Sequence, residues 1–223
     1  MSKNRDNKVK FNIKNAHYAK QNEAEDGTIT FETPVPVKGT VSVSFDANGD
    51  ISKFYADGIL YYVSAANNGY EGDAEFALIP DEFREDILKE QRDEKDVLHE
   101  VSGSGDTQKF AFLFEFDGDQ KATRRVLYNC TATRPSIESE TKEENVEPGT
   151  ETITISNSPL ANGRVKAQTT VDTDKTVYDG WYKAVYYPET ITVPLDLAYR
   201  CIAYYGWFKH SGSEYFREKY NVD

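Results

Sequence analysis

The residues best suited to catalysis are few in this sequence. Its histidines are His17, His99 and His210, and no Gly-x-Ser-x-Gly segment marks a nucleophile. A Ser-His-Asp mechanism needs a nucleophile held against a base, and folding can assemble such a triad from distant residues. Each histidine is nevertheless better interpreted as a structural residue. We therefore expect no catalytic residues and no enzymatic activity.

The sequence also contains no convincing metal or cofactor motif. No two His or Cys residues stand at ligand spacing. Asp46, Asn48 and Asp50 begin like a calcium loop, but the required glycine and the closing glutamate are out of position. Residues 102–106, SGSGD, lack the Gly-Lys-Ser/Thr that follows in a phosphate-binding loop. We expect no metal site and no cofactor.

Composition indicates a folded, acidic protein. The chain has 223 residues, of which 13% are aromatic, so it can build a full core of one or at most two domains. With 26 basic and 38 acidic residues, the net charge is −12. That charge disfavours nonspecific binding to nucleic acid, because phosphate contacts require clusters of Lys and Arg.

The cysteines and the N-terminus favour a reducing, cytoplasmic setting. Cys130 and Cys201 lie far apart without metal or redox spacing, so we expect two free thiols. The first residues carry basic side chains but no apolar stretch, and no run is long enough to span a bilayer. We expect neither a secretory signal nor a membrane segment.

A two-residue hydrophobic period predicts β-strands along most of the chain. Phe110, Phe112, Phe114 and Phe116 fall on one face of such a strand. The same alternation occurs in residues 41–45, 153–155 and 165–171. Turn residues at 46–50, 67–69, 117–119 and 162–163 predict hairpins between strands. Together these features predict a mainly β fold, a sandwich or barrel-like pair of antiparallel sheets.

Two short helices interrupt this pattern. The first is predicted after Pro80, where Phe83, Ile87 and Leu88 form one apolar stripe. The second is predicted from about residue 174 to Pro188, with Val177, Trp181, Ala184 and Val185 at helical spacing. Gly180 weakens this second prediction, because glycine costs about 1 kcal/mol relative to alanine inside a helix.

Two further segments have unusual compositions. Residues 136–150 are rich in glutamate and almost without apolar side chains, so they form either a solvated loop or an arm that reaches a neighbouring subunit. Residues 195–208 are dense in aromatic side chains and could form a third helix. They pack either on their own domain or on an adjacent subunit. The candidate inter-subunit contacts in these segments are Glu138, Glu140, Glu143, Glu144, Trp207 and Phe208.

Several segments, in order, carry a family resemblance. They are KFYAD at 53–57, ANNGYEGDAEFALIPDEF at 66–83, LYNCTATRPSIE at 127–138 and DTDKTVYDGWYKAVYYP at 172–188. With these segments, residues 7–188 resemble the major tail protein of long-tailed, non-contractile bacteriophages of Gram-positive hosts. Residues 189–223 do not match this pattern. The expected domains are an N-terminal arm (1–8), a tail-tube β domain (9–188) and a C-terminal extension (189–223).

The resemblance implies a structural role. Tail tube subunits assemble into stacked, hexameric rings that form the conduit for DNA ejection, and DNA passes through the lumen without specific binding. The implied partners are further copies of the chain, the tape-measure protein, the tail terminator and the distal tail protein. The implied location is the tail of the virion, after assembly in the cytoplasm of the host bacterium.

Two alternatives remain from the residues alone. One is a carbohydrate-binding or adhesive β-sandwich at a phage tip or cell surface, which would share the strands and the aromatic side chains. Adjacent tyrosines such as Tyr61 and Tyr62 would point to opposite faces of a strand, which suits a sheet packed on both faces better than a ligand platform. The other is a hydrolase on a β scaffold, which would need a pocket with converging polar groups.

Overall fold

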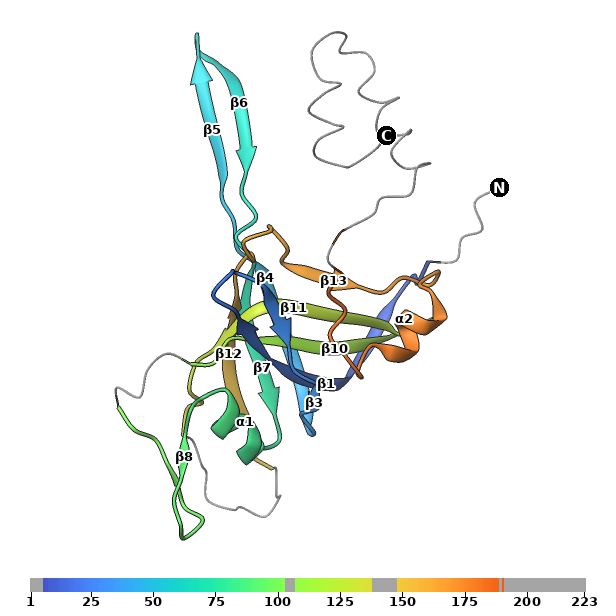
Figure 1. Cartoon of the computed structure of the whole chain (residues 1–223). Coiled ribbons are helices and arrows are strands. Elements are labelled where there is room, and N and C mark those ends of the chain that lie inside the picture. The colour runs from blue at the N-terminus through green and yellow to red at the C-terminus, as the bar shows by residue number, and fades with distance from the viewer. Residues whose placement is uncertain (1–5, 103–106, 138–147, 189, 191–223) are drawn as a thin grey trace. The chain divides into compact units, whose positions relative to one another are not determined.

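The computed structural model describes residues 6–102, 107–137, 148–188 and 190. The chain divides into two compact units, Met1–Tyr186 and Tyr187–Asp223, and the first contains all the helices and strands described below (Figure 1). In chain order the elements are β1 (Lys10–Glu23), β2 (Ile29–Phe31), β3 (Val35–Pro36), β4 (Thr40–Ala47), β5 (Ile51–Ala56), β6 (Ile59–Ala65), β7 (Tyr70–Phe76), α1 (Asp81–Asp86), β8 (Gln91–Arg92), β9 (Leu98–His99), β10 (Phe110–Gly118), β11 (Thr123–Ala132), β12 (Glu151–Asn157), β13 (Lys166–Gln168) and α2 (Lys175–Gly180).

The fold is mainly β, as predicted, with two short helices. One antiparallel sheet has the strand order β2-β1-β10-β11-β12-β7-β4, with β13 beside β11 and β3 beside β1. This sheet closes over its own core. Phe45 on β4 lies 6.2 Å from Phe112 and 6.0 Å from Phe114 of β10, measured between ring centroids. β4, at one end of the strand order, therefore faces β10 across the core, as in a sandwich.

The phenylalanine row of β10 forms the centre of this core. Phe110, Phe112 and Phe114 are buried, and the rings of Phe112 and Phe114 lie 5.3 Å apart, so the predicted shared face is confirmed. The opposite face of β10 is also buried, at Ala111, Leu113 and Glu115. A strand covered on both sides explains why β10 is apolar without interruption from Phe110 to Phe114. The predicted strand at 153–155 is β12, whose Ile153 and Ile155 are buried.

Asn129 marks the point at which β11 changes neighbour. Before it β11 pairs with β13, and after it β11 pairs with β12. Asn129 has a φ of 51°, and its backbone N–H donates to the side chain of Gln21 at 3.1 Å. Its Nδ2 donates to Ser158 Oγ at 2.8 Å. A side chain that tolerates a left-handed backbone and carries both donors and acceptors suits this kink.

The first helix agrees with its prediction and the second is shorter than predicted. α1 begins after Pro80, and Phe83, Ile87 and Leu88 are buried. α2 begins after Asp174, whose side chain accepts hydrogen bonds from Thr176 and Val177, but it ends at Gly180. The prediction that this helix continues to Pro188 is wrong. Glycine does not sustain the helix, and the chain turns so that Trp181 is buried.

Two of the predicted turns are instead the middle of one long ribbon. β4 pairs with β7, and the next residues along both strands continue as β5 paired with β6. Residues 48–50 and 66–69 lie opposite each other and are joined by backbone hydrogen bonds, so the predicted hairpin turns at 46–50 and 67–69 are wrong. Their glycines serve close backbone approach. A Cβ at Gly49 would overlap the carbonyl of Ala66, and one at Gly69 would overlap that of Asn157.

Gly69→Ala is therefore expected to destabilise the fold by about 2 kcal/mol, because it combines a φ of +102° with that overlap. The matched control is Gly180→Ala. An added Cβ there meets nothing within 4 Å, so that variant should keep or slightly raise stability. Urea unfolding followed by tryptophan fluorescence measures both, and equal stabilities would contradict the close approach at Gly69.

Candidate assembly surface

The β5–β6 hairpin stands apart from the core. Its strands pair with each other and with no other described strand. The connection is the two-residue turn Asp57-Gly58, with φ values of 53° and 76°, as in type I′ turns. In Figure 1 the hairpin extends beyond the point where β12 stops accompanying β7, so no other strand of the sheet covers it.

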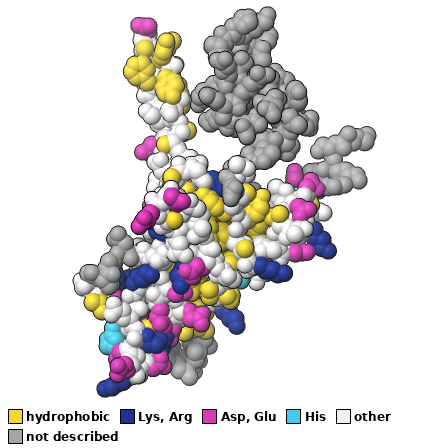
Figure 2. All heavy atoms as spheres, in the orientation of Figure 1, with side chains coloured by type: hydrophobic (Ala, Val, Ile, Leu, Met, Phe, Trp, Pro, Cys, Tyr) yellow, Lys and Arg dark blue, Asp and Glu magenta, His cyan; other side chains and the backbone are white. Residues whose placement is uncertain are grey.

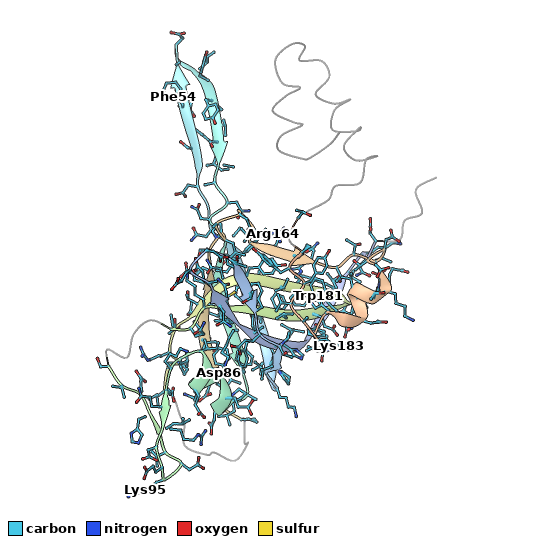
Figure 3. All side chains as sticks on the ribbon, in the orientation of Figure 1. Phe54, Asp86, Lys95, Arg164, Trp181 and Lys183 are labelled. Atoms are coloured by element: carbon cyan, nitrogen blue, oxygen red, sulfur yellow. The ribbon has the colours of Figure 1, made fainter. Side chains whose placement is uncertain are left out.

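The hairpin is covered by exposed apolar side chains. Half of the sixteen large apolar residues that are exposed in the described part of the chain lie within residues 51–63. Figure 2 shows them as a group on the projecting hairpin, and Figure 3 shows Phe54 near its end. We call this set the hairpin surface. It consists of Ile51, Phe54, Tyr55, Ile59, Leu60, Tyr61, Tyr62 and Val63.

This exposure is costly for a free subunit. Tyr61 is 70% exposed and Ile59 is 64% exposed, and Lys53 and Asp57 are the charged residues within the two strands and their turn. A two-stranded hairpin is at best marginally stable in water without a covering partner. Contiguous exposed apolar surface of this kind marks an interaction site. The hairpin therefore has the chemical character of an interface.

The expectation that Tyr61 and Tyr62 sit in a sheet packed on both faces is wrong within the subunit. Both rings are exposed, because neighbouring residues of β6 point to opposite faces and neither face meets the core. The signal that locates this hairpin was present in the sequence and was missed. Asp-Gly between two apolar runs is a strong short-range hairpin pattern, and it stands at residues 57–58.

β4 offers a second potential contact. It is the last strand in the order of the large sheet, pairing with β7 on one side and with no described strand on the other. Its pairing with β7 shifts register between Thr40 and Ser42, and Val41 is exposed. Asp46 is its one charged residue. A strand edge with so little protection readily accepts another strand.

The contact residues predicted from sequence lie outside the described residues. This holds for Glu138, Glu140, Glu143, Glu144, Trp207 and Phe208. Of the predicted N-terminal arm, residues 6–8 are described, and Asn7 and Lys8 contact their own subunit. Asn7 Nδ2 donates to Lys121 O at 2.6 Å, and the Lys8 N–H donates to Asp119 at 2.7 Å.

The most concentrated chemistry is a buried polar cluster around Glu115. Its carboxylate accepts from Arg124 Nε at 2.9 Å, Asn15 Nδ2 at 2.8 Å and the Tyr182 hydroxyl at 3.2 Å. His17 stacks on Tyr182 with ring centroids 4.5 Å apart. Burial raises the pKa of Tyr182 and lowers that of His17.

This cluster holds the segment after α2 against β10 and β11. Arg124 also donates to the carbonyl of Tyr178 and lies 3.8 Å from the centre of its ring. Because the carboxylate of Glu115 is occupied by these donors, the cluster stabilises the fold and offers no free base. The other close His–carboxylate pair, His99 with Asp93 at 3.0 Å, is exposed.

The described part of the chain offers neither a metal cluster nor a membrane-spanning helix. It holds no group of three His, Cys, Asp or Glu that could bind a metal ion. None of its helices is both long and apolar enough to cross a membrane. Cys130 is a buried free thiol, and Cys201 lies outside the described residues. No family model matches the chain, and no curated protein matches it.

Arg124→Met is expected to cost about 3 kcal/mol of stability, because it leaves the buried Glu115 carboxylate without its cationic partner. Adding Glu115→Gln should recover part of this loss, since no buried charge then remains unpaired. Urea unfolding of the two single variants and the double variant gives the coupling. Strictly additive effects would contradict a direct Glu115–Arg124 interaction.

Proposed function

We propose that the chain is a structural subunit of a bacteriophage tail tube, which assembles into stacked rings around a DNA conduit. The observation that carries the proposal is the hairpin surface, an apolar projection that no other strand among the described residues covers. The resemblance of residues 7–188 to major tail proteins and the mainly β fold support it. The role is assembly and involves no catalytic turnover.

A second copy of the chain is the partner that this surface fits best. Every copy of the chain carries the same surfaces. When one patch docks on a different patch of the next copy, the copies form rings or filaments. Burying the hairpin between copies removes its apolar side chains from water and stabilises its two strands. The open edge of β4 gives neighbouring subunits a further place to pair.

The acidic character of the chain suits a conduit for DNA. At a net charge of −12, side chains that face the lumen repel phosphate and give the polymer no place to bind. In this proposal the further partners are the tape-measure protein, the terminator and the distal tail protein. The assembled chain would reside in the virion tail. The resemblance to major tail proteins implies that its rings are hexameric.

One observation favours a second candidate, an adhesive or carbohydrate-binding module. Tyr55, Tyr61 and Tyr62 are at least 60% exposed, and exposed aromatic rings are typical stacking surfaces for sugars. Such a module would keep these rings free in solution. It would bind glycans as a monomer or trimer.

Negative-stain electron microscopy of the purified chain over a range of concentration and salt tests the proposal. We expect rings or tubes from the wild-type chain and their loss in the double variant Ile59→Ser, Leu60→Ser, because the hairpin surface then loses apolar contact area. The matched control is Leu78→Ser with Val97→Ser. Both of those residues are exposed outside the hairpin, and this variant should still assemble.

Assembly of the hairpin variant at wild-type concentrations would contradict the role of the hairpin. A wild-type chain that stays monomeric in every condition and binds a glycan array would contradict the tail-tube function and favour the adhesive module.

A further inference from the structure

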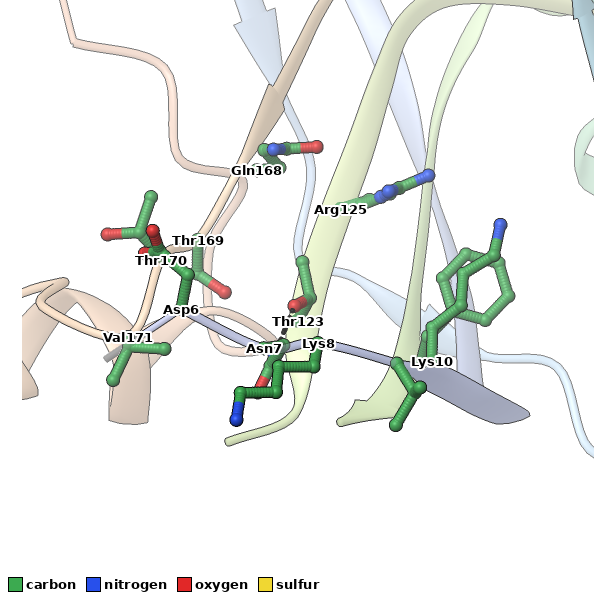
Figure 4. Close-up of a pocket in the computed structure, with 12 residues that line it drawn as sticks. Asp6, Asn7, Lys8, Lys10, Thr123, Arg125, Gln168, Thr169, Thr170 and Val171 are labelled. Carbon is green, nitrogen blue, oxygen red and sulfur yellow. Dashed lines mark hydrogen bonds between the residues drawn. The ribbon is translucent and has the colours of Figure 1, made fainter. Parts of the chain in front are cut away.

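A cavity of about 340 Å³ opens where the N-terminal segment crosses the sheet (Figure 4). Its walls are residues 6–10, the start of β11 with Phe116 of β10, and residues 168–171. Three cationic side chains line it, those of Lys8, Lys10 and Arg125. Such a gathering of positive charge is notable in a chain with twelve more acidic than basic residues.

The charge of Arg125 has no carboxylate partner among the described residues. Its Nε is buried without a hydrogen bond, and its guanidinium forms no ion pair with any described residue. Burial lowers the pKa of Arg125 from its ordinary value, because the charged form loses water. A buried N–H donor without a hydrogen bond is costly to the fold, and the Nε of this partly buried arginine is such a donor.

The neighbouring cations do not relieve this cost. Lys10 Nζ and the guanidinium carbon of Arg125 each lie 5.2 Å from the centre of the Phe116 ring. The ring attracts both, but it brings two like charges to the same part of the cavity. Asp6 also lines the cavity and forms no ion pair with Arg125 within the described structure. An incoming anion would satisfy both cations.

The cavity is preformed by backbone contacts. Asn7 fixes its N-terminal wall, because its Oδ1 accepts from the backbone N–H groups of Gln120 at 2.9 Å and Lys121 at 3.0 Å. Thr169 fixes the opposite wall, where its hydroxyl accepts from the backbone N–H of Arg124 at 2.9 Å. The cavity thus combines fixed walls, an aromatic ring and the unsatisfied Nε of Arg125, features that ligand sites share.

We propose that this cavity binds a carboxylate side chain from the glutamate-rich segment 138–144 of a second copy of the chain. The proposal rests on the assembly proposed above and names a specific contact within it. Arg125 and the two lysines provide the donors, and carboxylates match the planar fork of arginine.

Charge complementarity favours this occupant. Residues 138–144 contribute Glu138, Glu140, Glu143 and Glu144 against a single lysine, and they contain no apolar side chain that would need its own core. A nucleic acid is disfavoured, because the net charge of −12 repels a polyanion. A free phosphate ion shares the chemistry of the site and is one arm of the test below.

The stability of Arg125 variants distinguishes a binding role from a structural one. Arg125→Met removes an unpaired, partly buried charge, so its melting temperature should equal or exceed that of the wild type. Residues kept for binding often carry such a cost in stability. A clear fall in melting temperature would show that Arg125 serves the fold and would overturn the proposal.

Binding is measured on the unassembled full-length chain by NMR, following the Nε–H signal of Arg125, with a synthetic peptide of residues 136–147. We expect a saturable shift of this signal in the wild type. The Arg125→Met variant lacks the Nε–H group, so its binding is measured from the backbone signals of the cavity walls, and it should be at least about tenfold weaker. Lys183→Met is the matched control, since it removes one exposed charge outside the cavity. A peptide with glutamine at the four glutamate positions should bind at least tenfold more weakly.

Three results would overturn the proposal. One is no shift at 10-millimolar peptide, one is equal binding by Arg125→Met, and one is saturation by inorganic phosphate but not by the peptide. This titration requires no tube formation, so it separates the pocket from the proposed function. If wild-type tubes form, Arg125→Glu should block them, and lysine at Glu138, Glu140, Glu143 and Glu144 should restore growth. Normal tubes from Arg125→Glu would overturn the contact while leaving the tail-tube function intact.

Discussion

The β4–β7 ribbon is longer than the core that supports it, and the main features of the subunit depend on this constraint. Phe45 on β4 packs against the phenylalanine row of β10, so the β4–β7 part of the ribbon is covered by the core. β12 pairs with β7 from Tyr70 to Phe76. On the N-terminal side of Tyr70 the ribbon continues as β5 and β6, which pair only with each other among the described strands. Their large apolar side chains stay exposed in the described structure. An exposed apolar hairpin is unfavourable in isolation and favourable once another molecule covers it.

The parts of the fold that depend on local sequence could be predicted. The alternation of Phe110 to Phe116 and the stripe after Pro80 are local patterns, and the structure confirms β10 and α1. Glycine positions alone do not identify turns, because glycine satisfies two different structural requirements. Gly49 and Gly69 allow close backbone approach, whereas Gly58 allows a true turn. Only the pairing partners distinguish these cases, and they are distant in sequence.

The candidate sites were harder to predict, because they depend on side chains brought together by long-range pairing. Arg124 and Arg125 are adjacent in sequence yet differ completely in surroundings. One is paired with buried Glu115, and the other faces a cavity in which its Nε has no hydrogen bond to a described residue. Their opposite directions follow from the alternation of β11. The cavity beside Arg125 also requires Asn7, which contacts the β10–β11 connection more than a hundred residues away. No periodicity in the sequence indicates such a meeting.

Hydrogen–deuterium exchange of the free and assembled chain tests the central claim most directly. The account predicts fast exchange for the amides of residues 51–65 in the free subunit, because the hairpin has no covering partner. On assembly their exchange should slow by at least about tenfold, while the already buried amides of Ile153 and Ile155 change little. Hairpin amides that exchange equally fast before and after assembly would contradict the claim that this hairpin joins the subunits.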